Sequence, residues 1–334
     1  MGDVAMTVPV IKVLRDTYPK IKITILTKAF FKPLFKVINN VDIKIAEIEG
    51  EHKGVQGLYQ LSKDLKSQDL THIADLHNVL RSNILKTFLS FSRLKVATID
   101  KGRSEKKQVI KSSKNKIRFL KTTCQRYAEV FNQLGFPIEL NTYTYPKKLA
   151  VPSEINTNYL KGSERKWIGI APFAHYQSKT YPFSLLTEVV AELDRKNEFD
   201  ILLFGGGTKE IEQLRQLEKT FKNCTLISNK ISFAEEIQVL SNVDVMVAMD
   251  SGNAHIAAIF KLPVITLWGV THPGLGFAPF KQLLENCLLS DRNQYPLIPT
   301  SVYGNKVPKG YENAMQTIPP KTVINKILEV IKQK

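Results

Sequence analysis

Apolar runs of strand length alternate with amphipathic segments of helix length along almost the whole chain. The helix-length segments include 79–89, 124–134 and 184–195. This alternation predicts parallel sheets whose strands are connected through helices. The strands that the pattern predicts are 21–27, 42–48, 71–76, 94–99, 167–173, 199–205, 224–228, 243–248 and 263–268.

A polar stretch at 145–165, which contains Pro146, Pro152 and Gly162, separates two series of such elements and has the composition of an interdomain linker. The chain of 334 residues is long enough for two domains that each bury a core. We therefore predict an α/β protein with two Rossmann-like, doubly wound parallel-sheet domains, residues 1–150 and 151–334, facing a cleft.

The first predicted element is a helix, because the chain opens MGDVAMTVPV and a Gly-Asp turn leads directly into it. A doubly wound domain normally places a buried strand before such a turn. We expect that the first strand of the first domain is missing and that the true start lies about ten residues upstream, one strand plus a lead.

The cysteines and the uncharged stretches indicate a cytoplasmic protein. Cys124, Cys224 and Cys287 are scattered and have no metal-site spacing, which fits a reducing compartment. Charged residues interrupt the first apolar positions, so no secretory signal is visible. The longest stretch without Lys, Arg, Asp or Glu, 262–280, contains three prolines and three glycines and predicts a strand plus loop rather than a membrane span.

The net charge of +16 is concentrated in the first half of the chain. Residues 1–150 hold 27 basic and 13 acidic side chains, whereas residues 151–334 hold 20 and 18. The segment Lys101–Arg126 alone holds ten basic residues and one acidic residue. A solvated face is one explanation. A surplus confined to one half favours an anionic partner, which would be nucleic acid, an anionic lipid surface or a phosphorylated substrate.

The segment 245–272 is the most informative part of the chain. A buried strand is followed by the turn Asp250-Ser251-Gly252, a short helix through Phe260 and a second buried strand. A helix start presents unpaired amides and partial positive charge, so this turn suits a phosphate or a sugar hydroxyl. Open α/β sheets bind ligands at that edge, which indicates a nucleotide-sugar site. His255 lies in the first helical turn, where it is either a ligand contact or a packing residue.

Two polar groups in the first half have both a functional and a structural interpretation. Asp3 would place a carboxylate at a helix start facing the cleft, but Asp is also a favoured N-cap, and the residues alone favour the cap. Asp75 and Asn78 close the third strand, with Arg81 on the helix that follows. They form either an anion-binding edge or a helix cap, Asn78, beside an exposed Arg81.

In the second half, Lys179 lies in the loop 172–182, where it would neutralise a departing diphosphate or simply be solvated. His272, at the end of a predicted strand, is a further candidate to line the cleft. Gly205-Gly206-Gly207 is not a dinucleotide G-x-G-x-x-G, and no Walker A run exists. A nicotinamide oxidoreductase is therefore disfavoured.

Four segments together resemble glycosyltransferase family 9, the ADP-heptose:lipopolysaccharide heptosyltransferases. They are GDVAMTVPVIKVLRDTYP, ADLHNVLRS, the Lys179-Thr-Tyr-Pro loop, and DSGNAHIAAIFKLPVITLWGVTHP, and they span residues 2 to about 273. The D-S-G-x-x-H element followed by P-V-x-x-x-W-G is the most specific of them. The resemblance implies a GT-B fold, with the donor held mainly by the second domain and the acceptor mainly by the first.

The resemblance also implies roles for the candidate residues in an inverting transfer that needs neither a metal nor a cofactor. Asp3 matches the proposed catalytic base, which takes the proton of the acceptor hydroxyl. Lys179 matches a donor-contacting lysine that stabilises the leaving diphosphate. The turn Asp250, Ser251 and Gly252, with His255, matches the donor-binding turn, and Asp75, Asn78 and Arg81 are acceptor-side candidates.

The predicted function is transfer of a heptose, or a related sugar, from an ADP-sugar to a lipopolysaccharide or lipooligosaccharide core acceptor. We expect an anionic glycolipid acceptor, weak peripheral contact with an anionic membrane at the inner face of the cytoplasmic membrane, and no nucleic-acid partner. Two alternatives remain open. One is a transferase of the same fold that uses another nucleotide sugar, and the other is a noncatalytic basic module that binds anionic lipid or nucleic acid through Lys101–Arg126.

Overall fold

The structure is a computed structural model that describes all residues except 91–93, 115, 161–164 and 334. It divides into two compact units. The first comprises Met1, Asp3–Lys101 and Thr123–Thr144, and the second comprises Gly2, Gly102–Thr122 and Tyr145–Lys334. The change of unit at 144–145 coincides with the first residue of the predicted linker, 145–165. The segment Gly102–Thr122 differs from the predicted boundaries, because it packs with the second unit rather than the first.

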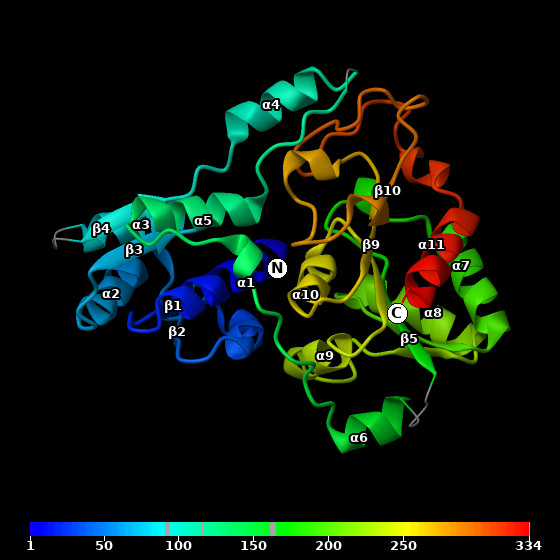
Figure 1. Cartoon of the computed structure of the whole chain (residues 1–334), viewed down its shortest axis with the longest axis horizontal. Coiled ribbons are helices and arrows are strands. Elements are labelled where there is room, and N and C mark those ends of the chain that lie inside the picture. The colour runs from blue at the N-terminus through cyan, green and yellow to red at the C-terminus, as the bar shows by residue number, and fades with distance from the viewer. Residues whose placement is uncertain (91–93, 115, 161–164, 334) are drawn as a thin grey trace. The chain divides into compact units, whose positions relative to one another are not determined.

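The first unit contains two pairs of parallel strands and their connecting helices (Figure 1). Its strands are β1 (Thr24–Thr27), β2 (Asp42–Ile45), β3 (His72–Asp75) and β4 (Lys95–Thr98). Its helical elements are α1 (Gly2–Thr17), η1 (Ala29–Val37), α2 (Gly54–Lys66), α3 (Leu80–Leu89), α5 (Thr123–Gln133) and η2 (Leu140–Thr142). Each of the four strands lies inside a range that the apolar pattern predicts.

The two strand pairs of the first unit are separate sheets in the described residues, β1 with β2 and β3 with β4. The sequence predicted a doubly wound parallel sheet without its first strand in this domain, and the structure has two parallel strand pairs. Leu58, Leu61 and Leu65 of α2 bury their apolar face against Leu85 and Leu89 of α3 to form the core beside β3.

The second unit is built on one sheet of six parallel strands, in the order β10-β9-β8-β5-β6-β7. The strands are β5 (Lys166–Ala171), β6 (Phe199–Leu203), β7 (Cys224–Leu226), β8 (Val245–Met249), β9 (Val264–Trp268) and β10 (Cys287–Leu289). The helices are α4 (Arg103–Lys111), α6 (Ser153–Ile155), α7 (Phe183–Lys196), α8 (Thr208–Thr220), α9 (Phe233–Leu240), α10 (Gly252–Ile259) and α11 (Pro320–Lys332). Short turns complete it: η3 (Asn156–Leu160), η4 (Gln177–Lys179), η5 (Pro273–Leu275), η6 (Leu284–Asn286) and η7 (Ala314–Thr317).

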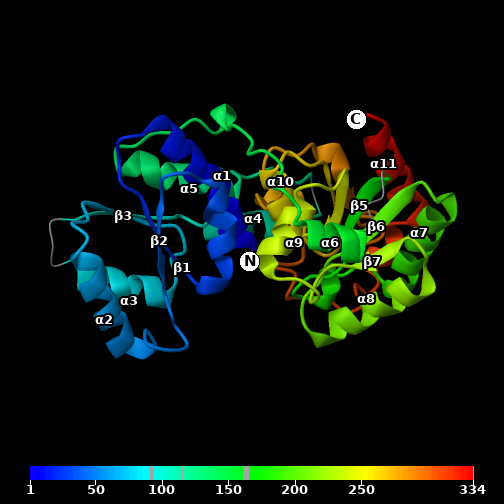
Figure 2. The same cartoon turned by 90° about the horizontal axis from the view of Figure 1, so that it is seen from below.

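Strand order in the second unit reverses between β5 and β8. The chain proceeds outward from β5 through β6 to β7, then returns to β8 on the other side and continues to β10. All five residues of β8 and all five of β9 are buried, as expected for strands covered on both faces. Helices α7 and α11 pack side by side, and α10 packs on β8 and β9 (Figures 1 and 2). Such a reversal is where open α/β sheets bind their ligands.

An apolar seam explains why Gly102–Thr122 packs with the second unit. Val109, Ile117 and Leu120 bury their side chains against Leu275, and the Leu120 amide donates to the Gly274 carbonyl at 2.9 Å. The segment was predicted to belong to the basic first domain, 1–150. Its three inward apolar side chains instead attach it to the loop that follows β9.

The uncharged stretch 262–280 forms β9 and the loop through η5, in agreement with the strand-plus-loop prediction. Within the described ranges, no helix combines the length and the apolar composition needed to cross a bilayer.

Candidate functional site

Lys179 and Asp250 meet at the point where the strand order reverses. Lys179 ends η4, in the loop after β5, and Asp250 directly follows β8. These two strands are neighbours, with Ala171 opposite Ala248 at their carboxyl ends. The Lys179 Nζ lies 2.9 Å from the Asp250 Oδ2, and the two side chains are only 11% and 9% exposed. Two candidates separated by 71 residues in the sequence therefore form one ion pair.

A third loop also reaches this ion pair. The Thr271 hydroxyl, after β9, donates to the Asp250 Oδ2 at 3.0 Å. Thr271 is 2% exposed. Thr271 was not among the predicted site residues, and its signal in the sequence is its place in the turn that follows the strand beside β8. One carboxylate oxygen thus connects the loops after three adjacent strands.

Two glycines position the Lys179 loop. A Cβ at Gly269 would lie 2.2 Å from the Ser178 carbonyl oxygen, so only glycine lets that backbone approach. Gly304 has φ +81°, and a Cβ there would lie 2.8 Å from the Lys179 Cγ. The Ser178 hydroxyl donates to the Gly304 carbonyl at 2.5 Å. The stem of Lys179 is therefore packed against backbone, which limits the positions that its ammonium can reach.

The turn after β8 leaves a helix start without a side-chain cap. Ser251 is the N-cap of α10 and is extended, with φ −150° and ψ 174°, but its side chain makes no capping hydrogen bond. Within the described residues, its buried hydroxyl oxygen has no hydrogen-bond partner. The first α10 amides, beginning at Gly252, and the positive end of the helix dipole are thus available to an anion. His255 is 6% exposed in the first turn of this helix.

His272 has a structural role in the turn at η5. Its ring is 6% exposed, and its Nδ1 accepts a hydrogen bond from the Gly274 amide at 3.0 Å. Burial, together with the nearby Arg292 cation, lowers the pKa of His272 to about 4. The imidazole is therefore neutral at physiological pH, and its acceptor nitrogen shapes the turn at η5.

Asp3 lies in the first turn of α1, in the first unit, and its side chain is exposed. The N-cap of this helix is Met1, so the capping interpretation of Asp3 is wrong. The Asp3 carbonyl accepts a hydrogen bond from the Tyr127 hydroxyl at 3.2 Å, and Tyr127 is 2% exposed on α5. A buried tyrosine therefore fixes the backbone that carries this carboxylate.

The Asp75 carboxylate is occupied by internal contacts. It accepts hydrogen bonds from the His77 amide at 3.0 Å, the Asn78 amide at 2.8 Å and the Ser82 hydroxyl at 3.0 Å. The Lys86 Nζ lies 2.7 Å away, and the Asp75 side chain is 4% exposed. Burial would raise the Asp75 pKa, but Lys86 and the two amides lower it further, so the net shift is downward.

Asn78 is also part of this internal network and is not the helix cap. The N-cap of α3 is Val79. Asn78 has φ +46°, a left-handed conformation that asparagine tolerates better than most residues. Its side-chain amide donates to the Ile99 carbonyl at 3.0 Å, beyond the end of β4. Asp75 and Asn78 thus hold the turn between β3 and α3 in shape.

Arg81 differs from these two residues because its side chain is exposed and, within the described part of the chain, has no hydrogen-bond or ion-pair partner. Desolvation and the Lys101 cation lower the pKa of His77, with a smaller contribution from Arg81, while Asp3 and Asp75 oppose them. Asp3, Asp75, Arg81 and Lys101 are therefore each close enough to His77 to shift its pKa. His77 and Lys101 were not named as site residues, although both flank strand ends.

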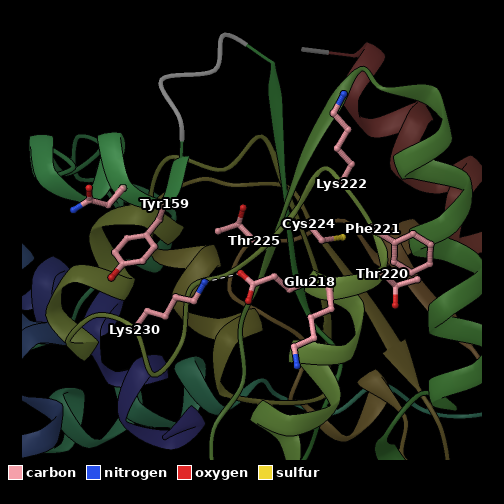
Figure 3. A pocket seen from close by; sticks show the side chains of 10 residues that line it. Tyr159, Glu218, Thr220, Phe221, Lys222, Cys224, Thr225 and Lys230 are labelled. Atoms are coloured by element: carbon pink, nitrogen blue, oxygen red, sulfur yellow. Dashed lines mark hydrogen bonds and ion pairs between the residues drawn. The ribbon is translucent and has the colours of Figure 1, made fainter.

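A separate surface hollow of about 450 Å³ lies beside the edge strand β7 (Figure 3). Tyr159 and Lys222 lie on its walls, and Glu218 and Lys230 face each other across it with Oε1 and Nζ 2.6 Å apart. Strands β5 and β6 separate β7 from β8 in the sheet. The hollow is therefore distinct from the group around Lys179 and Asp250, and its facing charges neutralise each other.

Two α/β units with parallel sheets, the second with an ion pair at its strand-order reversal, match the GT-B fold. The profile described as glycosyltransferase family 9 (heptosyltransferase) matches residues 58–332. The chain belongs to this family and is a glycosyltransferase. The resemblance predicted from four sequence segments is confirmed.

The similarity to known proteins covers nearly the whole chain. Lipooligosaccharide heptosyltransferase 2 of Haemophilus influenzae is 25% identical, over 99% of this chain and 96% of the relative. The glycosyl transferase family 9 structure from Veillonella parvula has a TM-score of 0.75 at 16% identity and covers 100% of this chain and 95% of that one. Heptosyltransferase WaaC of E. coli with ADP has a TM-score of 0.68 at 17% identity and covers 98% of this chain and 96% of that one. The predicted fold class is confirmed.

Replacing Asp75 by Asn should destabilise the protein by about 2–3 kcal/mol, because it leaves the poorly exposed Lys86 ammonium unpaired. Asp64→Asn, which alters an exposed pair with Lys44 (Nζ–Oδ2 3.8 Å), should change stability by under about 1 kcal/mol. Urea unfolding monitored by circular dichroism measures both. An equal, small effect of the two substitutions would show that the Asp75 network contributes little.

The Asp75 effect should also depend on pH in one direction. Its pKa is depressed in the folded state, so its contribution is present above the unfolded pKa of about 3.9 and is lost as pH falls through the folded value. The difference in unfolding free energy between the wild type and Asp75→Asn should therefore narrow from about pH 7 to about pH 3. A gap that stays constant over that range would contradict the assignment.

Proposed function

We propose that this glycosyltransferase transfers a heptose, with inversion, from an ADP-sugar to the core of a lipopolysaccharide or lipooligosaccharide. Family membership and the ion pair of Lys179 with Asp250 at the strand-order reversal support the proposal most directly. Among similar proteins, one is a lipooligosaccharide heptosyltransferase, and another is a heptosyltransferase whose structure was solved with ADP.

The donor diphosphate would bind between Lys179 and the start of α10. An ammonium has three N–H donors, and Asp250 engages one of them, so two remain for phosphate oxygens. The uncapped amides from Gly252 onward supply a second set of donors. Both groups hold positive charge where the leaving ADP gains negative charge, which lowers the barrier selectively in the transition state.

Asp250 would hold Lys179 in place and also bind a sugar hydroxyl. Its Oδ2 accepts from Lys179 and Thr271, while its Oδ1 accepts no hydrogen bond within the described residues. A carboxylate oxygen that is free and preorganised suits a ribose or heptose hydroxyl. The buried hydroxyl of Ser251 offers a further polar contact at the same turn.

Asp3 is the proposed base, acting on the acceptor hydroxyl. A carboxylate is competent to accept that proton as the hydroxyl attacks the anomeric carbon. The cationic side chains Arg81 and Lys101, which lie near His77 as Asp3 does, would attract an acceptor that carries phosphates or carboxylates. Asp75 and Asn78 would contribute by fixing the turn from which Arg81 projects, rather than by touching the acceptor.

No metal is required by this arrangement, since Lys179 and helix amides supply the charge that a divalent cation would otherwise provide. A transferase of the same fold that uses another nucleotide sugar is the principal alternative. A noncatalytic basic module is disfavoured because such a protein has no need of a part-buried Lys179–Asp250 pair beside a turn whose Ser251 hydroxyl has no partner among the described residues.

ADP should raise the melting temperature of the protein in the presence of EDTA, and more so than UDP or GDP. Lys179→Ala should weaken ADP binding about 10- to 100-fold, because it removes charge-assisted hydrogen bonds to phosphate. Lys219→Ala, on an exposed part of α8, is the matched control and should bind as the wild type does. Stabilisation by UDP but not ADP would support the alternative donor, and dependence on added metal would contradict the metal-free mechanism.

Gly304→Ala should weaken ADP binding about tenfold, because the added methyl group displaces the Lys179 stem. Gly310→Ala provides a close control, since Gly310 also has a left-handed φ of +88° but has open space around its Cβ position. Both variants should lose stability from the left-handed φ, and Gly304→Ala should lose more because of its steric contact, which thermal melting checks. Calorimetric titration of ADP should separate them. Equal ADP affinity would show that Gly304 does not position Lys179.

Asp3→Asn should reduce turnover about 10²- to 10⁴-fold, the usual contribution of a general base, and leave ADP affinity unchanged. Asp16→Asn, on the same helix α1, should keep near-normal turnover because the Asp16 carboxylate makes only exposed contacts, with Lys12 and with the Thr144 hydroxyl. ADP release with ADP-heptose and a lipopolysaccharide core acceptor measures both. Undiminished turnover in Asp3→Asn would exclude this residue as the base.

A further inference from the structure

The segment Gly102–Thr122 has one apolar face and one cationic face. It contains eight basic residues and one acidic residue. Helix α4 and the extended residues after it face the second unit with Val109, Ile117 and Leu120. On α4, Arg103, Lys107 and Lys111 are exposed, and their spacing of four residues places them in one row along the helix. The apolar face is therefore covered, and the cationic face is not.

The attachment of the segment to the second unit is specific. Besides the apolar seam, the Leu120 amide donates to the Gly274 carbonyl, and the Arg292 guanidinium donates to the Ser113 carbonyl. Gly276 has φ +87°, and a Cβ there would lie 2.4 Å from the Lys121 carbonyl oxygen, so the two backbones are in close contact. Lys106, the buried cation of α4, lies 4.0 Å above the Phe277 ring. These contacts therefore hold the segment that carries the exposed cations in a fixed position on the second unit.

The outward cations are not neutralised by the protein. Exposed basic side chains occur along the whole segment, and none of those named here forms an ion pair with another described residue. They are Arg103, Lys107, Lys111, Lys114, Lys116 and Arg118. These six cations lie within 16 residues of one another in the sequence, and their charges repel each other. Binding of an anionic partner would reduce that repulsion.

Large aromatic side chains accompany the cations. Phe119 is 53% exposed, between Arg118 and the buried Leu120, and its ring has an edge contact with His272 at 5.9 Å between centroids. Tyr303 is 51% exposed and lies 6.2 Å from the Phe277 ring over which Lys106 sits. Aromatic rings beside exposed Lys and Arg are typical of surfaces that lie at the headgroup level of a bilayer.

We propose that the cationic face of Gly102–Thr122, with Phe119, is a membrane-docking surface that binds the anionic phospholipid headgroups of a bilayer. The proposal rests on the proposed function insofar as a lipid-linked acceptor would bring the enzyme to such a bilayer. Charge complementarity selects anionic headgroups, and Phe119 inserts at their level. The second unit, which holds Lys179 and Asp250, would then be carried to the membrane by its own surface.

Vesicle binding tests the proposal with the full chain. The wild type should sediment with vesicles of phosphatidylcholine and phosphatidylglycerol, but not with phosphatidylcholine alone, and high salt should release it as the Debye length falls from about 10 Å to about 3 Å. The triple variant Arg103→Gln/Lys107→Gln/Lys111→Gln should bind at least about tenfold more weakly, because each cation near an anionic surface contributes about fivefold. The control Lys219→Gln/Lys222→Gln/Lys321→Gln removes the same charge from exposed sites elsewhere in the second unit and should bind normally.

Phe119→Trp reports on insertion. Its fluorescence should shift to the blue on anionic vesicles, whereas a tryptophan at the exposed Leu284 should not shift. Equal binding of the two triple variants would overturn the proposal, as would equal binding to neutral vesicles. Binding of an RNA or DNA duplex through the same cations, with no vesicle binding, would identify the surface as a nucleic-acid site instead.

The vesicle assay and the ADP-binding assay test separate proposals, so either proposal can be rejected while the other stands. Neither set of vesicles contains a saccharide acceptor, so binding there measures headgroups and not the acceptor. Vesicle binding without ADP stabilisation would leave the docking surface standing and reject the proposed donor. The triple variant at Arg103, Lys107 and Lys111 is decisive for the other case. If ADP still stabilises it and it still binds vesicles normally, the proposed transferase function is supported and the docking surface is rejected.

Discussion

The ion pair between Lys179 and Asp250 is the interaction on which the geometry of the candidate site depends. It joins the loops after β5 and β8 at the strand-order reversal, and Thr271 adds the loop after β9. Its low exposure makes the charges interact strongly and also makes either one costly to leave alone. A site built this way keeps a cation in a fixed place before any ligand arrives, so less ordering is required when a diphosphate binds.

Each unit has a poorly exposed aspartate side chain at the end of a strand that pairs with a lysine, and the two aspartates differ in the acceptor capacity that remains. Asp75 accepts from two amides, a hydroxyl and an ammonium, which nearly exhausts its oxygens. Asp250 accepts from one ammonium and one hydroxyl at a single oxygen. A saturated carboxylate stabilises the fold, and an unsaturated one is able to bind a ligand. The residue types and strand-end positions alone do not separate these two cases.

Much of the fold follows from local pattern, because strand period, burial and helix amphipathicity are properties of neighbouring residues. All nine predicted strands are present, and β10 was missed because its three residues lie in a loop-rich stretch. The pairing of Lys179 with Asp250 needed the strand order, which brings together residues 71 positions apart. Thr271, Gly269 and Gly304 were missed for a related reason. Their roles arise from loop-to-loop contacts that no periodicity records.

The unit to which the basic residues belong was also not predictable from local sequence pattern. Division of the chain at residue 150 places the basic surplus in the first domain, yet Gly102–Thr122 packs with the second unit. Three buried side chains, Val109, Ile117 and Leu120, determine that association, although they are outnumbered by cations in the same segment. Exposed charge interacts weakly with the fold because water screens it, whereas an apolar side chain gains free energy only against a matching surface. The three apolar side chains therefore determine where the segment packs. The more numerous exposed cations remain available to bind an anionic partner in solution or at a membrane.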